Sequence, residues 1–93
     1  MNQQQNESKQ LSQEGIDKLR FFLNQCEQII TQLRLDINEI KDELKIMQEE
    51  HQSSELINET QLKLNQLETN CSTVEKQYNN LLYLQSKNTD TQQ

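Results

Sequence analysis

The residues best suited to chemistry in this 93-residue chain are Cys26, His51 and Cys71, its two cysteines and its one histidine. A zinc ion needs about four Cys or His ligands at short spacing, and three residues this far apart do not supply them. A nucleophilic site needs a thiol or hydroxyl beside a positioned base, and a phosphate site needs a glycine-rich loop. The chain holds a single glycine. We therefore predict that the protein is not an enzyme and binds no metal, cofactor or other small-molecule ligand.

Both cysteines fall within series of apolar residues that recur at alternating steps of three and four. If the chain folds back near residue 53, Cys26 lies opposite residues 79 and 80, about 13 Å along the helix axis from Cys71. A disulfide needs its two Cα atoms within about 7 Å of each other. Both cysteines are therefore expected to be small, buried apolar side chains, with an intermolecular disulfide or a redox switch as the alternative.

The first apolar series predicts a long helix with one continuous packing seam. Its three-four spacing persists for five heptads, which is the repeat of supercoiled helices. The members are Ile16, Leu19, Leu23, Cys26, Ile30, Leu33, Ile37, Ile40, Leu44 and Met47. Ser12 suits the N-cap position, because its hydroxyl can accept from the free N–H groups of the first turn. Phe22 and Ile29 widen the apolar surface beside the seam, which favours a bundle of three or four helices over a two-stranded coiled coil.

A second apolar series follows in a different register. Its members are Ile57, Leu64, Leu67, Cys71, Val74, Tyr78 and Leu81, with Thr60 as the one polar interruption. Between the two series, the expected seam positions hold His51 and Ser54, which are poor core residues. A change of structure is therefore predicted between residues 50 and 55.

Two architectures fit this break, and both belong to the all-α coiled-coil class. In the favoured one, the chain turns at residues 52–54 and Ser53 or Ser54 caps a second helix, so that an antiparallel helical hairpin completes a bundle with partner helices. In the other, one continuous helix runs through the break, because neither Gly nor Pro interrupts it. The expected helices cover 12–51 and 55–85. Residues 1–11 and 86–93 are almost wholly polar and are expected to be disordered tails.

Charge and hydropathy exclude several classes of partner. The chain has 15 acidic and nine basic residues, and the basic ones are scattered, whereas nucleic acids and anionic membranes attract clusters of Lys and Arg. No stretch of roughly 18 apolar residues is present to span a bilayer, and the first ten residues are too polar for a secretory signal. We predict a cytoplasmic protein that neither binds nucleic acid nor inserts into membranes. Its 26 Gln and Asn residues are interpreted as compositional bias.

Acidic residues concentrate just before the break. They are Asp36, Glu39, Asp42, Glu43, Glu49 and Glu50. This cluster is interpreted as a solvated helix face, with a docking surface for a basic partner as the alternative.

Large apolar side chains outside the seams mark the expected binding surface. Phe21 and Phe22 lie near one end of the sequence, Leu82, Tyr83 and Leu84 lie near the other, and a hairpin would bring the two groups together. A two-helix unit cannot cover all of this surface by itself. The predicted partner interface comprises Ile16, Leu19, Phe22, Leu23, Ile29, Ile30, Leu33, Ile37, Ile40, Leu44, Met47, Ile57, Leu64, Leu67, Val74, Tyr78, Leu81 and Leu82.

The segment EGIDKLRFFLNQ, followed by Ile30, Leu33, Ile37, Ile40 and Leu44, resembles the Snapin-like small helical subunits of the complexes that build or position lysosome-related organelles. The similarity covers about 70 residues and implies an elongated hetero-oligomer of similar small subunits, peripheral on endosomal or lysosomal membranes through its partners. A second likeness, carried by the pair Phe21 and Phe22 and by His51, is to the N-terminal helices of syntaxin-type membrane-fusion proteins. The interval from Phe21 to His51 is longer here than in those proteins.

Two functions follow as hypotheses. The first is a non-catalytic coiled-coil subunit or adaptor of a hetero-oligomeric complex, assembled with other coiled-coil proteins by apolar burial and possessing no enzymatic activity. The second is a self-sufficient homodimeric spacer or a regulator of one target, or, as the second likeness implies, a syntaxin-like N-terminal helical module. A concentration-dependent melting transition of the pure protein would favour the second hypothesis.

Overall fold

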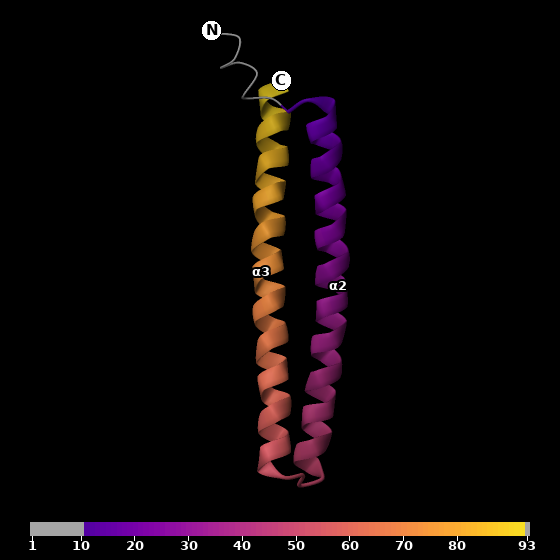
Figure 1. Ribbon diagram of the computed structural model, residues 1–93, viewed down its shortest axis with the longest axis vertical. Helices are drawn as coiled ribbons and strands as arrows, with labels where there is room; N and C mark the ends of the chain where they lie inside the picture. Colours follow the sequence, from indigo (N-terminus) through magenta and orange to yellow (C-terminus); the bar gives the residue numbers. More distant parts are fainter. Residues whose placement is uncertain (1–10, 93) are drawn as a thin grey trace.

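Two long antiparallel α-helices make up the fold in the computed structural model, which describes residues 11–92 (Figure 1). Helix α2 spans Gln13–Glu49 and helix α3 spans Ser54–Gln92. The molecule measures 69 × 19 × 18 Å. Leu11 and Gln92 lie at one end, here called the open end, and the connection between the helices lies at the other, the loop end (Figure 1). The predicted all-α hairpin is confirmed, and the continuous helix is wrong.

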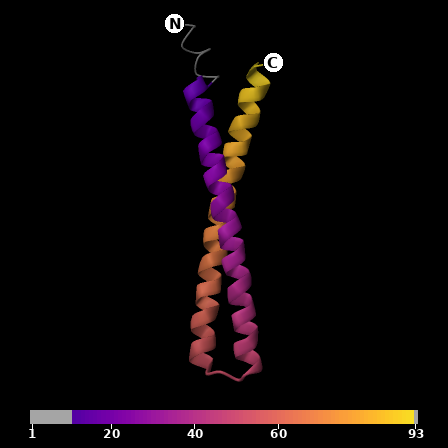
Figure 2. The same cartoon turned by 90° about the vertical axis from the view of Figure 1, so that its right-hand side faces the viewer.

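The two helices twist about each other. Seen from the side they cross, whereas in the first view they run side by side (Figure 2). A seam that repeats every 3.5 residues drifts slowly around an α-helix, which makes 3.6 residues per turn, and the helices must coil to keep their seams in contact.

A serine side chain caps the N-terminus of each helix. The hydroxyl of Ser12 accepts from the N–H of Gly15 at 3.1 Å, and Glu14 lies in the first turn of α2. The hydroxyl of Ser53 accepts from the N–H of Leu56 at 3.2 Å. Each serine thus satisfies one of the free N–H groups of a first helical turn. The N-cap prediction at Ser12 is confirmed, and of the two predicted caps for the second helix, the structure uses Ser53.

The chain leaves α2 through a Schellman motif centred on His51. The His51 N–H donates to the carbonyl of Gln48 at 3.3 Å, and the Gln52 N–H donates to the carbonyl of Met47 at 2.9 Å. The motif requires a left-handed residue after the C-cap, which is usually glycine. Here that residue is His51, with φ 56°. His51 therefore ends the helix in the absence of any Gly or Pro nearby.

The core is one layer of side chains between the helices. Its buried members are Leu19, Leu23, Cys26, Ile30, Ile37 and Leu44 from α2, and Thr60, Leu64 and Cys71 from α3. Among the described residues none is fully buried. The polar member, Thr60, donates its hydroxyl to the carbonyl of Leu56 at 3.0 Å, so its burial leaves no unsatisfied group.

The helix bounds differ from the predicted ones at four places. α2 begins at Gln13 instead of residue 12, because Ser12 is its N-cap. α2 ends at Glu49 instead of residue 51, because His51 reverses the backbone, and α3 begins at Ser54 instead of residue 55. α3 also continues to Gln92, seven residues beyond the predicted end. No Gly or Pro follows Leu84, so the ladder of backbone hydrogen bonds runs on past the last apolar residue. Residues 1–10 of the predicted N-terminal tail, and residue 93, lie outside the described residues.

Candidate partner-binding surface

Most residues of the predicted partner interface pack within the chain itself. Leu19, Leu23, Ile30, Ile37, Leu44 and Leu64 are buried between α2 and α3. A further group is half-buried along the same seam, and its members are Ile16, Leu33, Ile40, Met47, Ile57, Leu67, Val74, Tyr78 and Leu81. Three predicted interface residues remain exposed: Phe22, Ile29 and Leu82. Of the predicted interface residues, these three are exposed on the hairpin and available to a partner.

Large apolar side chains gather at the open end, as the sequence predicts for a hairpin. Phe21 and Phe22 of α2 are 57% and 50% exposed, and their rings meet edge to face with centroids 5.8 Å apart. Across from them on α3, Tyr83 and Leu84 are 62% and 53% exposed. We call Phe21, Phe22, Leu82, Tyr83 and Leu84 the apolar end.

A shallow apolar groove runs between the helices beside the apolar end. Its walls are Phe22 and Cys26 of α2 and Leu81 of α3, and its rim is formed by amide side chains. The rim residues are Gln25, Gln77 and Asn80. Neutral amides can donate hydrogen bonds to a partner chain and accept them from it. Because they carry no charge, their burial does not require an ion to be desolvated. The groove therefore suits an apolar side chain of a neighbouring helix.

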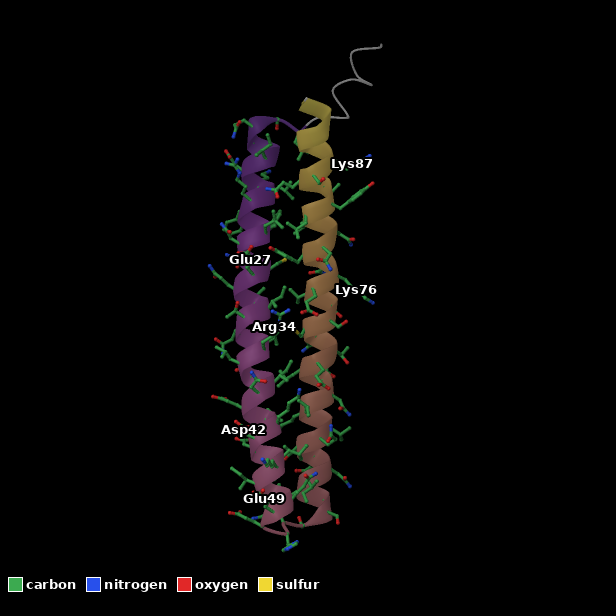
Figure 3. The ribbon with its side chains drawn as sticks, turned by 180° about the vertical axis from the view of Figure 1, so that it is seen from behind. Glu27, Arg34, Asp42, Glu49, Lys76 and Lys87 are labelled. Atoms are coloured by element: carbon green, nitrogen blue, oxygen red, sulfur yellow. The ribbon has the colours of Figure 1, made fainter. Side chains whose placement is uncertain are left out.

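The opposite side of the seam has polar contacts between the helices around a second shallow hollow, which is lined by Glu27, Ile30, Thr31, Arg34, Glu75, Tyr78 and Asn79. Arg34 of α2 makes an ion pair with Glu75 of α3, at 2.5 Å between Nη2 and Oε2. The hydroxyl of Tyr78 donates to Oε2 of Glu27 at 2.8 Å. Figure 3 faces this side and shows Arg34 and Glu27 along the inner edge of α2.

These contacts raise the pKa of Arg34 and the pKa of Tyr78. The hydrogen bond to Glu75, together with the charge of that carboxylate, raises the pKa of Arg34 above its ordinary value. The hydrogen bond to Glu27 raises the pKa of Tyr78, with desolvation and the Glu27 charge adding to the effect. Both shifts stabilise the form that donates the hydrogen bond. This side therefore serves the hairpin's own register.

The two flanks of the α2 seam differ in chemistry. The flank that Figure 3 faces, here the polar flank, consists of Arg20, Asn24, Glu27, Thr31, Arg34, Asn38, Lys41, Lys45 and Gln48. The other flank, here the outer stripe, consists of Phe22, Gln25, Ile29, Gln32, Asp36, Glu39, Glu43 and Ile46. The polar flank has four basic residues and one acidic residue and no large apolar side chain. The outer stripe has three acidic residues, three large apolar side chains and no basic residue.

Sequence reasoning missed several exposed apolar side chains. Leu35, Ile46, Leu56 and Leu62 are also exposed, from 41% to 67%, and none was expected to contribute. The outer stripe has its own three-four spacing, which is visible in the sequence. Its apolar members are interrupted by amides and carboxylates, so a search for apolar residues alone does not detect it.

The groups considered for chemistry lie apart from one another. Cys26 and Cys71 are both free and buried; Cys26 lies beside Tyr78 and Cys71 beside Arg34, at different levels of the hairpin. His51 is in the turn and exposed. Within residues 11–87, whose side chains the structure describes, no group of three or more His, Cys, Asp or Glu side chains is placed to hold a metal ion. In the same part of the chain, neither helix is long and apolar enough to cross a membrane.

Comparison with known proteins returned no matching family model, no matching curated protein and no matching solved structure.

Proposed function

We propose that the protein is a non-catalytic subunit or adaptor of a hetero-oligomeric complex, joined to other helical proteins through its own apolar side chains. The observation that carries the proposal is the apolar end. Phe21, Phe22, Tyr83 and Leu84 are each half or more exposed although they lie together at one end of the hairpin. Large apolar side chains left exposed at one end of a molecule mark sites of protein interaction.

The thinness of the hairpin supports a helical partner. Its core is one layer deep, with Ile37 still 9% exposed and Leu44 8% exposed. Two helices cover only one stripe of each other, and the stable arrangement for such units is a bundle with further helices. A partner helix over the groove of Phe22, Cys26 and Leu81 would bury both the groove and part of the apolar end.

The Snapin-like resemblance supports one cellular setting for the complex. We infer a cytoplasmic subunit that assembles with other small coiled-coil proteins and reaches endosomal or lysosomal membranes through them. The long, narrow shape of the hairpin, 69 × 19 × 18 Å, suits an elongated assembly of such subunits.

Mass spectrometry of the proteins that co-purify with an epitope-tagged copy, expressed at its natural level in its own cells, tests the proposal. A fixed set of helical proteins at equal stoichiometry is the expected result. Recovery of the chain by itself, as a folded dimer, would contradict it.

A homodimeric spacer is the second candidate, and one observation favours it. Residues 11–31 and 73–92, the half of the hairpin at the open end, contain five acidic and four basic residues, whereas residues 32–72 contain nine and four. Two copies that meet through their open-end halves would keep the acidic halves apart. In that case the pure protein melts at a temperature that rises with its concentration.

A further inference from the structure

The outer stripe has the spacing of a second packing seam on α2. Phe22, Gln25, Ile29, Gln32, Asp36, Glu39, Glu43 and Ile46 follow each other at alternating steps of three and four. This spacing keeps one helix in continuous contact with a neighbour. Phe22, Ile29 and Ile46 are 50%, 45% and 52% exposed, so the hairpin leaves about half of each of these side chains uncovered.

Charge is arranged in order along the stripe. Phe22 and Ile29 lie toward the open end, and Ile46 lies next to the turn. Between them come the acidic members, of which Asp36 accepts a hydrogen bond from Gln32 at 3.0 Å. Glu39 and Glu43 have no ion-pair partner among the side chains of residues 11–87. The stripe is thus apolar at both ends and negatively charged in its middle.

The basic residues of α2 do not offset this charge, because they lie on the other flank of the seam. Lys41 and Lys45 belong to the polar flank, and Arg34 there is engaged by Glu75. Level with the stripe's middle, α3 contributes on this side one exposed acidic residue and one exposed basic residue, Glu59 and Lys63. The negative charge of the stripe's middle is therefore uncompensated within the described part of the chain.

From this arrangement we propose that the outer stripe binds a helix of a different protein, apolar at its two ends and carrying Lys or Arg in its middle. Apolar contacts would form at Phe22, Ile29 and Ile46, and ion pairs at Glu39 and Glu43. The inference rests on the proposed function and specifies the chemistry of the partner.

The spacing of the stripe sets the dimensions of this partner helix. Phe22 and Ile46 are 24 residues apart, or about 36 Å along the axis at 1.5 Å per residue. The partner helix therefore needs about seven turns. Its basic residues must lie ten to fourteen positions from the apolar residue that contacts Ile29, because Glu39 and Glu43 are ten and fourteen positions from Ile29.

A second copy of this chain does not fit the stripe. Two stripes in parallel orientation would place Glu39 and Glu43 against the same residues of the other copy. In antiparallel orientation, centred on the stripe, these carboxylates would face Ile29 and Gln25. Neither orientation supplies a cation to the acidic positions, and the first places like charges together.

A synthetic helical peptide tests the proposal directly. The probe is a labelled peptide of about 28 residues, with Leu at the positions that contact Phe22, Ile29 and Ile46 and Lys or Arg at those that contact Glu39 and Glu43. A second peptide has Glu in place of each Lys and Arg. Binding to the full-length protein is measured by fluorescence anisotropy at low salt, and we expect the basic peptide to bind at least about tenfold more tightly than the acidic one.

Matched variants assign that binding to the stripe. Glu39→Lys/Glu43→Lys should weaken binding of the basic peptide by at least about tenfold and strengthen binding of the acidic peptide. The control is Asp42→Lys/Glu49→Lys, which makes the same charge change on exposed positions of the same helix that point away from α3 (Figure 3). It should change the affinity by less than about threefold. Ile29→Gln and Leu35→Gln form the equivalent apolar pair, since both side chains are exposed and only Ile29 belongs to the stripe.

If Glu39→Lys/Glu43→Lys and Asp42→Lys/Glu49→Lys weakened binding of the basic peptide equally, the proposal would be overturned. The attraction would then be only a long-range effect of net charge. Failure of the wild-type protein to bind the basic peptide would overturn the proposal as well. The proposal would also be overturned if sedimentation equilibrium showed that the pure protein is a dimer and that Ile29→Gln makes it a monomer. The stripe would then bind a second copy.

The same variants separate this inference from the proposed function in cells. If the tagged wild-type chain is recovered without partners, the proposed function fails. If it is recovered with a fixed set of partners and Glu39→Lys/Glu43→Lys retains all of them, the proposed function stands and the stripe proposal fails. Loss of one partner from that variant and not from Asp42→Lys/Glu49→Lys supports both.

Discussion

His51 is where the backbone departs from the geometry that L-amino acids prefer. Its φ of 56° lies in the left-handed region, where the Cβ crowds the following carbonyl. The side chain is exposed and sits in the turn, so its packing does not offset this cost. The position gains its left-handed conformation from the two hydrogen bonds of the Schellman motif, donated by His51 and Gln52.

Replacement of this histidine by glycine should stabilise the hairpin. Glycine adopts positive φ without steric cost, so we expect His51→Gly to raise the free energy of unfolding by about 1 kcal/mol. Urea unfolding followed by circular dichroism measures the change. Gln52→Gly is the control, because φ at Gln52 is not positive and added flexibility there should only destabilise. Equal effects of the two substitutions would contradict the role assigned to His51.

Tyr78 should make the stability of the hairpin depend on pH in the alkaline range. Its hydrogen bond to Glu27 raises its pKa, so the folded state holds the phenolic proton more tightly than the unfolded chain does. The resulting stabilisation is complete below about pH 10, where an unfolded tyrosine begins to ionise, and is lost as the pH rises through the higher pKa of the folded state.

The measurement is urea unfolding at about pH 8 and about pH 11, on either side of that range. The wild-type protein should lose more stability between the two conditions than Tyr78→Phe, which has no proton to lose. Tyr83→Phe, which removes the hydroxyl of an exposed tyrosine, should behave like the wild type. Parallel loss of stability in the wild type and in Tyr78→Phe would show that the hydrogen bond contributes nothing.

At the scale of the helices, neighbouring apolar residues on α2 have very different roles. Ile37 is 9% exposed in the seam, whereas Leu35 is 55% exposed on the outer surface. We expect Ile37→Ala to lower the free energy of unfolding by about 2 kcal/mol, since it leaves a space in a one-layer core. Leu35→Ala should change it by less than about 0.5 kcal/mol. Chemical denaturation of both variants measures the difference, and similar losses would mean that the seam is misplaced.

The same distinction affects how partner binding is tested. Ile37→Asp or Leu67→Asp would place a charge between α2 and α3, because both residues pack in the hairpin seam. Either substitution should therefore unfold the hairpin and abolish assembly together. Substitutions at exposed positions are needed to separate partner contacts from folding.

Helix type, the helix seams and the turn region were predictable from the sequence because each depends on local pattern. The three-four spacing identifies the seams, and Ser12 and Ser53 have the chemistry of N-caps. The end of α2 was placed two residues late because a left-handed histidine has no sequence signature. The cross-helix pairs were not predicted either, since the pairing of Arg34 with Glu75 depends on how the turn staggers the helices.

The exposed apolar surface was predicted only in part, for a different reason. Periodicity shows that a position is apolar and which face it lies on, but the seam of a hairpin and the seam of an intermolecular coiled coil have the same pattern. Leu64 and Ile30 therefore looked like partner contacts and are buried within the chain. Phe22 and Leu82 fall outside both seams, and they remain exposed as the apolar positions next to the open end.

On the scale of the whole molecule, the hairpin has ends of different character. The apolar end lies at the open end, opposite the turn (Figure 1). The acidic residues concentrate in residues 32–72, the half that contains the turn. A partner that binds through apolar contacts is therefore directed to the open end, and like charges discourage contact between loop ends.

Polar substitution at the apolar end should separate assembly from folding. We expect Phe21→Gln/Tyr83→Gln to change the hairpin's free energy of unfolding by less than about 0.5 kcal/mol, because both side chains are largely exposed. The same variant should lose its stoichiometric partners in the co-purification. The control, Leu35→Gln/Leu62→Gln, changes two equally exposed residues away from this end and should keep them. Retention of all partners by Phe21→Gln/Tyr83→Gln would show that the apolar end is not a contact site.

The four-residue connection from Glu50 to Ser53 determines where a label can be attached without harm. Both described ends of the chain lie at the open end, where a partner is expected to bind (Figure 1). An epitope inserted between Gln52 and Ser53 would sit at the far end of the hairpin, after the hydrogen bonds that end α2 and before the cap of α3. Lengthening an exposed connection costs little, about 0.6 kcal/mol for each doubling. Detection, purification and imaging are therefore best done through the turn.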